Sequence, residues 1–299
     1  MNRIVRYAKK NHLLFVVCTL GPVLALFAFI RVIPIIRTAY YSFTNYSLLI
    51  PKPAFVGVGN YITMLRDASL HAAFVNTVLI TLACVFITLS LALLFSVLLR
   101  RIEKSSTVYE MIFFIPVITP WVPATVIWRW LFDPTFGIIN QVLGLLRLPT
   151  QSWLQQPDQV IYAIVIISIW KTLGYYMIIY SVGLRNIPLE FYEAATVDGA
   201  GHGRQFRHIT MPLLKPIVLF SMIMASIQFF NTFTVAYVIS SEAQGSPSYE
   251  CKVLVWEIYR NGFGYYKMGY ASAEAMVLLV FILIVIFIQF RLLRYETEY

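Results

Sequence analysis

Polar residues interrupt two long apolar segments of the sequence, residues 160–182 and 213–240, where charged and amide side chains are costly. The first segment holds a lysine beside a glycine and two tyrosines, and the second holds two amides and a hydroxyl at helical spacing. Amides beside aromatic rings suit a polyhydroxylated ligand, because they bond its hydroxyl groups while a ring stacks on its apolar face. We therefore expect ligand contacts from Lys171, Gly174, Tyr175, Tyr176, Gln228, Asn231 and Thr232.

The same residues have a second interpretation. Amide and hydroxyl side chains in membrane helices also bond neighbouring helices. Lys171 could likewise form a structural ion pair in the middle of its segment. From the sequence alone, both interpretations stay open.

The sequence lacks the motifs of catalysis. None of its 14 glycines begins a GxxxxGK[ST] segment, so this chain is not its own P-loop ATPase. It has no nucleophile elbow and no zinc-protease helix, its four histidines are scattered, and its three cysteines stand apart. We therefore expect no metal, no bound cofactor and no enzymatic activity in this chain.

The composition is that of an integral membrane protein. The chain is 59% hydrophobic and 12% charged, with a mean hydropathy of +0.74, whereas soluble domains are about a quarter charged. Its net charge of +9 is spread over short loops, so we expect contact with membrane lipid and no nucleic-acid partner. We predict one all-α domain over residues 1–299 with six transmembrane helices, at about 13–30, 73–99, 111–131, 160–182, 213–240 and 271–290.

Two features refine this prediction. Pro116, Pro120 and Pro123 should kink or unwind the third span, and its freed carbonyls then need partners in the bundle interior. Basic residues gather in the segments that share a side with the two termini. The positive-inside rule therefore places both termini and the segment 186–212 in the cytoplasm.

The segment 186–212 is too charged to lie in lipid. It holds Glu190, Glu193, Asp198, Arg204 and Arg207, which together would cost more than about 12 kcal/mol at the centre of a bilayer. Helix signals over residues 189–197 and the glycines that follow predict a short helix, a glycine turn and a second helix.

This segment resembles the EAA loop of permease subunits of bacterial ABC importers. The resemblance rests on Glu193-Ala194-Ala195, Gly199, Ile209 and Pro212 in their spacing. The segments DGA at 198–200 and FRHIT at 206–210 are typical of carbohydrate-type, maltose-permease-like members, and Met211 departs from the usual leucine. The segments FVGVGNY at 55–61 and WRWLFDP at 128–134 also resemble elements of these permeases.

The resemblance implies a type I ABC importer permease fold in a bacterial inner (plasma) membrane. It implies a second permease subunit, two copies of a cytoplasmic ABC ATPase that bind ATP and Mg²⁺, and an extracytoplasmic substrate-binding protein. The ligand site could belong to this permease or to its partner. The residues implied to dock the ATPase are Glu193, Ala194, Ala195, Asp198, Gly199, Ile209 and Pro212.

Two other classes compete with the importer permease. A secondary transporter or channel that works without ATP would favour carboxylates within the spans and an internal repeat. The sequence offers only Glu274 near the end of a span, and no convincing repeat. The second competing class is a structural or receptor membrane protein. In such a protein the glycine-hinged segment 186–212 would have no evident function.

Overall fold

The computed structural model describes residues 2–49, 52–100, 106–241 and 252–293. These residues form helices joined by turns, with no strand among them, which confirms the all-α prediction. They belong to two compact units: Met1–Arg66 with Ile258–Val277, and Asp67–Glu257 with Leu278–Tyr299. The expectation of a single domain over residues 1–299 stays a prediction.

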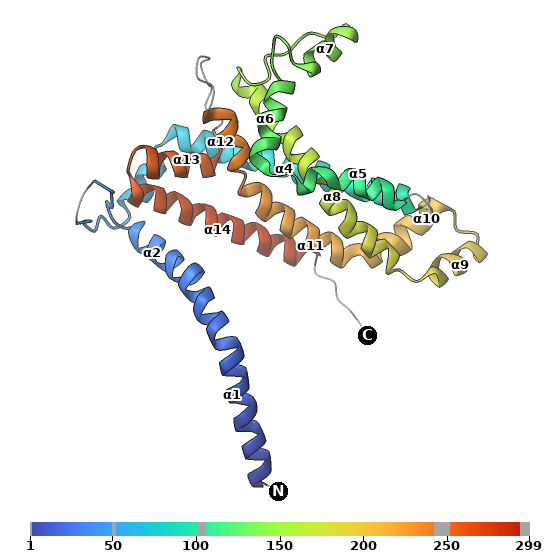
Figure 1. The fold of residues 1–299 in the computed structure, drawn as a ribbon, viewed down its shortest axis with the longest axis horizontal. Helices are drawn as coiled ribbons and strands as arrows, with labels where there is room; N and C mark the ends of the chain where they lie inside the picture. The colour runs from blue at the N-terminus through green and yellow to red at the C-terminus, as the bar shows by residue number, and fades with distance from the viewer. Residues whose placement is uncertain (1, 50–51, 101–105, 242–251, 294–299) are drawn as a thin grey trace. The chain divides into compact units, whose positions relative to one another are not determined.

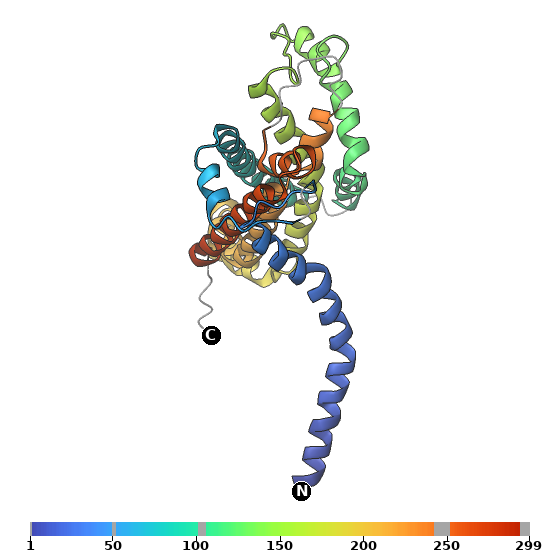
Figure 2. The same cartoon turned by 90° about the vertical axis from the view of Figure 1, so that its left-hand side faces the viewer.

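The first unit begins with a long rod of three consecutive helical segments (Figures 1 and 2). These are α1 (Asn2–Phe27), the π-turn η1 (Ala28–Val32) and α2 (Ile33–Tyr41). An apolar helix runs over Phe15–Tyr41, past the bound predicted at residue 30. Pro34 lies within it, just after the π-turn. The bounds of the first span stay a prediction.

The remainder of the first unit packs a loop against the start of the last helix. It contains α3 (Gly59–Met64), η3 (Arg260–Gly264) and the start of α14 (Met268–Leu293), with the end of α13 (Leu254–Tyr259). Asn60 donates hydrogen bonds to the carbonyls of Ser42 and Thr44, at 2.8 and 2.9 Å. A Cβ on Gly269 would lie 2.1 Å from the Thr44 carbonyl oxygen, so only glycine permits this approach.

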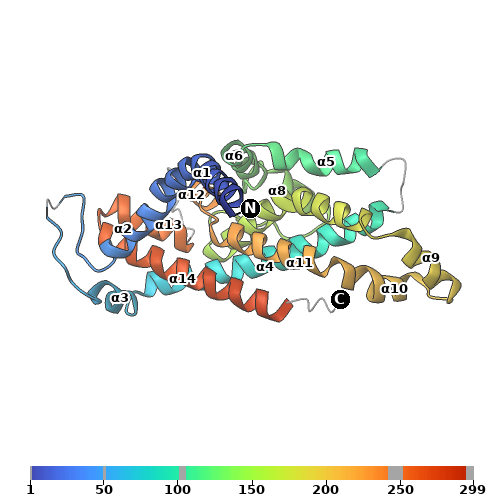
Figure 3. The ribbon, with the colours of Figure 1, turned by 90° about the horizontal axis from the view of Figure 1, so that it is seen from below.

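The second unit holds the other helices. Its long helices α4, α8 and α11 pack against one another (Figures 1–3; clearest in Figure 3). The helices are α4 (Ala68–Arg100), α5 (Ser106–Ile118), α6 (Trp121–Leu131), α7 (Ile138–Leu145), α8 (Pro157–Arg185), α9 (Leu189–Val197), α10 (His202–Gln205), η2 (Phe206–Thr210), α11 (Met211–Phe230) and α12 (Thr234–Ser241).

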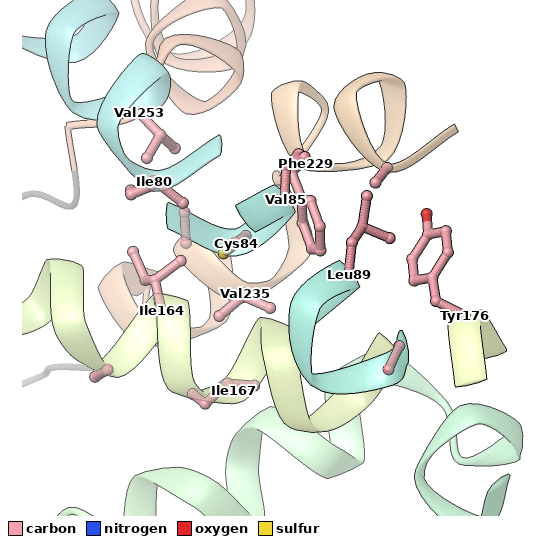
Figure 4. Close-up of a cluster of buried hydrophobic side chains, with 14 of the residues drawn as sticks. Ile80, Cys84, Val85, Leu89, Ile164, Ile167, Tyr176, Phe229, Val235 and Val253 are labelled. Carbon is pink, nitrogen blue, oxygen red and sulfur yellow. The ribbon is translucent and has the colours of Figure 1, made fainter. Parts of the chain in front are cut away.

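The core of the second unit lies where α4, α8 and α11 meet (Figure 4). Ile80 and Leu89 of α4 pack in one buried cluster with Ile164 and Ile167 of α8 and with Phe229 of α11. Fully buried alanines on the same three helices, Ala92, Ala163 and Ala225, keep the backbones close. These contacts fix the helices that carry the candidate site.

Within the described residues, five helices are long and apolar enough to cross a membrane. A sixth span is counted if α5 and α6, which meet at an angle of 98°, form one broken span. The five are Phe15–Tyr41, Ala68–Arg100, Gln159–Arg185, His202–Ile239 and Met268–Leu292. The predictions of a polytopic membrane protein and of a kinked third span are confirmed.

Candidate functional site

The break between α5 and α6 is held by a buried lysine. In an unbroken α-helix, the carbonyls of Pro116 and Val117 would accept hydrogen bonds from residues 120 and 121. Pro120 has no N–H, and Trp121 begins a new helix. The ammonium of Lys171 on α8 replaces these donors, at 2.6 Å from the Pro116 oxygen and 2.9 Å from the Val117 oxygen. Lys171 is 4% exposed, and in the described part of the chain its ammonium is stabilised by these two carbonyl oxygens.

The other candidates on α8 have three different surroundings. A Cβ on Gly174 would lie 2.0 Å from the Phe113 carbonyl oxygen, so α5 occupies the space that was expected to admit a ligand. Tyr176 is fully buried, and its hydroxyl donates to Oε1 of Gln228 at 3.0 Å. Tyr175 is 38% exposed and meets the Tyr176 ring edge-on. Tyr176 thus makes the interhelical bond that the second interpretation allows.

The candidates at the end of α11 do not share one helical face, and that prediction is wrong. The helix ends at Phe230, because the side chains of Asn231 and Thr232 bond the last carbonyls in place of a further helical turn. Asn231 Nδ2 donates to the Ile227 oxygen, and Thr232 Oγ1 donates to the Phe229 oxygen, both at 2.7 Å.

The two residues nevertheless meet Gln228 in one pocket of about 310 Å³. Gln228 is exposed toward it, and its Nε2 has no hydrogen-bond partner among the described residues. The pocket therefore presents one free amide donor beside an amide oxygen and a hydroxyl. Its walls are completed by Trp121, Ile227, Phe229, Phe233, Thr234 and Val235.

Trp121 is the pocket residue that sequence reasoning missed. Its ring lines the pocket, and its centroid lies 5.2 Å from Nζ of Lys171, within the range of a cation–π contact. Lys171 therefore reaches the pocket only through this ring. The signal was present in the sequence, since Trp121 directly follows the proline that breaks the span.

The segment 186–212 folds as predicted into a helix, a glycine turn and a second helix. Helix α9 covers Leu189–Val197, the predicted range. It ends in a Schellman motif, in which the Ala200 N–H bonds the Ala195 oxygen at 2.8 Å and the Gly199 N–H bonds the Thr196 oxygen at 3.0 Å. Gly199 has a φ of +75°, a conformation that costs a residue with a side chain about 1–2 kcal/mol.

The docking candidates divide into an outer and an inner group. Glu193, Ala194, Asp198, Gly199 and Pro212 are exposed and Ala195 is half-buried. Ile209 instead packs on a buried cluster of Leu184, Ile187 and Leu214. The outer face also carries apolar residues that sequence reasoning did not assign to docking, Phe191 and Val197, the latter 87% exposed.

Tyr192 fastens α9 to the helix bundle. Its hydroxyl accepts a hydrogen bond from Arg100 Nη1 at 3.0 Å and lies 2.9 Å from Oγ1 of Thr210. The Arg100 guanidinium also lies 4.5 Å from the centre of the Tyr192 ring. Gln205 links the second helix to the glycine turn, because its side chain donates hydrogen bonds to Thr196 Oγ1 and to the Ala200 oxygen. Tyr192 thus links α9 to the end of α4 and to η2.

The chain is similar to curated permeases over nearly its whole length. It is 33% identical to the probable ABC transporter permease protein YesP of Bacillus subtilis, over 94% of this chain and 90% of that protein. It is also 33% identical to the sulfoquinovosyl glycerol transport system permease protein SmoG of Agrobacterium fabrum, over 98% and 94%. The trehalose/maltose transport system permease protein MalF of Thermococcus litoralis is 29% identical, over 94% and 92%.

A solved structure has the same fold. A chain of the bacterial alginate ABC transporter, in complex with alginate pentasaccharide-bound periplasmic protein, matches with a TM-score of 0.83 at 20% identity, over 99% of both chains. Residues 104–294 match the family described as binding-protein-dependent transport system inner membrane component. No finding supports a secondary transporter or channel. The chain is a multi-pass inner-membrane permease that belongs to the family of binding-protein-dependent transport system inner membrane components.

Proposed function

We propose that this permease translocates a sugar, an oligosaccharide or a related polyol. The observation that carries the proposal is the pocket at the two helix breaks, where the Trp121 ring lies beside Gln228, Asn231 and Thr232. A sugar needs an aromatic surface for its apolar face and amide and hydroxyl groups for its hydroxyls. The names of two relatives, the sulfoquinovosyl glycerol and the trehalose/maltose transport system permeases, support the same substrate class.

Within this proposal, the predicted site residues take different roles. Gln228, Asn231, Thr232 and Trp121 contact the sugar. Tyr176 orients the Gln228 amide from behind, and Tyr175 stays a candidate contact on the exposed side of α8. Lys171 supports Trp121 from the far side of its ring. Gly174 acts by letting α5 approach α8.

The chain needs partners to do this work. We propose a second permease subunit, two copies of a cytoplasmic ABC ATPase that bind ATP and Mg²⁺, and an extracytoplasmic substrate-binding protein. The alginate transporter, with its periplasmic protein, supports the last of these. In this assembly the chain itself hydrolyses nothing, and both of its termini face the cytoplasm, as the distribution of basic residues favours.

The exposed face of α9 is the proposed contact with the ATPase. Glu193, Ala194, Ala195, Asp198 and Gly199 present small and acidic groups that allow close approach. Val197, Phe191 and Pro212 add apolar area that is uncovered in this chain. Ile209 acts from inside, by holding α9 on the buried cluster. Closure of the ATPases would reach the spans through Tyr192 and would expose the pocket alternately to the two sides of the membrane.

The proposal is tested by transport in proteoliposomes that contain the complete importer. Labelled maltose, trehalose and sulfoquinovosyl glycerol are offered with the cognate binding protein. Trp121→Leu and Gln228→Leu should each lower uptake at least about fivefold, because a lost stacking or hydrogen-bonding contact is worth about 1–3 kcal/mol. Trp130→Leu is the control, since Trp130 is on the same helix and is 65% exposed. If neither pocket variant lowers uptake, the proposed site is refuted. If no sugar is taken up in an ATP-dependent way, the proposed substrate class is refuted.

A further inference from the structure

A second polar pocket, of about 380 Å³, lies at the opposite end of the second unit's helices. Its lining includes Arg100 at the end of α4, Arg185 at the end of α8 and Thr107 at the start of α5, together with Ser181 and Glu110. Figure 3 shows these helix ends beside α9 and α10. The pocket shares no lining residue with the sugar pocket, and the proposed transport function does not use it.

Among the described residues that line it, the pocket has two arginines and one glutamate. Glu110 is already occupied, since its Oε1 lies 2.6 Å from Nη2 of Arg185. Arg100 donates one hydrogen bond to the Tyr192 hydroxyl and has no carboxylate partner among the described residues. A guanidinium has five N–H donors, so both arginines keep donors for a further acceptor.

Ser181 adds a buried hydroxyl group to the pocket. It is 4% exposed, it lines the pocket, and its Oγ has no hydrogen-bond partner in the described part of the chain. Buried hydroxyl groups are rarely left without a partner, because the lost bond to water is not replaced. An acceptor in the pocket would satisfy this donor.

We propose that this pocket binds a phosphate group. Arginine forks match phosphate oxygens in two-pronged geometry. The proposed orientation places the pocket at the cytoplasmic membrane surface, where anionic lipid headgroups and soluble phosphates both occur. A neutral sugar would leave the excess positive charge uncompensated.

The test uses the full-length chain with two probes. The first is phosphatidylglycerol in phosphatidylcholine nanodiscs, with its retention measured by native mass spectrometry. The second is inorganic phosphate, titrated by calorimetry in lipid-free detergent. Arg100→Gln and Ser181→Ala are compared with Arg291→Gln, which removes an exposed charge from the last turn of α14 outside the pocket. Ser181→Ala deletes an unpartnered hydroxyl, so it should leave the unfolding temperature unchanged or higher.

The expected result is about tenfold weaker binding in both pocket variants and wild-type binding in Arg291→Gln, as for the loss of one charge-assisted hydrogen bond. If the loss affects phosphatidylglycerol, the ligand is a lipid headgroup. If it affects inorganic phosphate alone, the ligand is a soluble phosphate. The proposal is overturned if neither probe binds the wild-type chain, or if both pocket variants bind as tightly as wild type. Because sugar uptake is not measured, this result is independent of the transport proposal.

Discussion

Lys171→Met is the sharpest test of how the candidate site is built. Methionine keeps the apolar stem of lysine but has no donor for the carbonyls of Pro116 and Val117. The sequence suggested that Lys171 touches the ligand. The structure instead places its ammonium on the backbone of the α5–α6 break, behind the ring of Trp121.

The magnitude follows from two opposing terms. Two hydrogen bonds from a charged donor are lost, at about 1.5–3 kcal/mol each, or about 3–6 kcal/mol together. Removal of a charge from the membrane interior regains about 2.5–3.5 kcal/mol. The net destabilisation therefore lies between about zero and 3.5 kcal/mol, and Thr119 Oγ1 still bonds the Pro116 oxygen at 2.6 Å. The variant should insert and fold, but with Trp121 no longer held in place.

The assay is sugar uptake by the reconstituted importer, with KM and maximal rate measured separately and thermal unfolding followed in parallel. We expect Lys171→Met to raise KM with little loss of protein, and Lys171→Arg, which keeps N–H donors, to recover part of the affinity. In the Trp121→Leu background, Lys171→Met should add almost nothing, because both changes act on the same ring. A wild-type KM and rate in Lys171→Met would refute this reasoning. Fully multiplicative effects in the double variant would indicate instead that Lys171 contacts the sugar directly.

Three further predictions concern packing and coupling. Gly199→Val should uncouple uptake from ATP hydrolysis, because valine is strained at a φ of +75°. Gly201→Val is the control and should retain coupling, because Gly201 has a φ of −68°. Equal uptake by the two variants would argue against a role for the turn. Gly174→Ala should lower the unfolding temperature, since the new Cβ would clash with the α5 backbone. Gly144→Ala is the control, because a Cβ there has no atom within 4 Å. Equal unfolding temperatures for the two variants would contradict this prediction. Tyr192→Phe keeps the ring over Arg100 but removes the shared hydroxyl, so we expect more ATP hydrolysed per sugar imported, and an unchanged ratio would count against Tyr192 as the link.

Much of the architecture could be predicted because membrane insertion leaves a strong mark on sequence. Hydrocarbon thickness sets the length of the apolar runs, and the charges of residues 186–212 exclude that segment from lipid. The helix over residues 189–197 was found at its predicted bounds because the helix signals and the glycine stop agree. The helix that contains the first predicted span continues to Tyr41, because residues 31–41 are apolar enough to extend it.

The site was harder to predict, because polarity within a span has two possible causes. A polar side chain can serve a ligand, or it can serve backbone groups that a helix break has freed. Lys171, Asn231 and Thr232 all bond backbone carbonyls. Pro120 marks one break in the sequence, but the break at residues 231–233 contains no proline, so a regular helix was the natural expectation there.

The two breaks explain why the pocket forms where it does. Helices α6 and α12, which each follow a break, pack against one another, so Trp121 from one break faces the residues at the other. Side chains that bond the freed carbonyls stabilise both breaks, whereas the Gln228 amide nitrogen and the Trp121 ring bond none of these carbonyls in the described part of the chain. A ligand-binding role is therefore tested most directly on Gln228 and Trp121, since substitution of Lys171, Asn231 or Thr232 would also release the backbone carbonyls that these side chains bond.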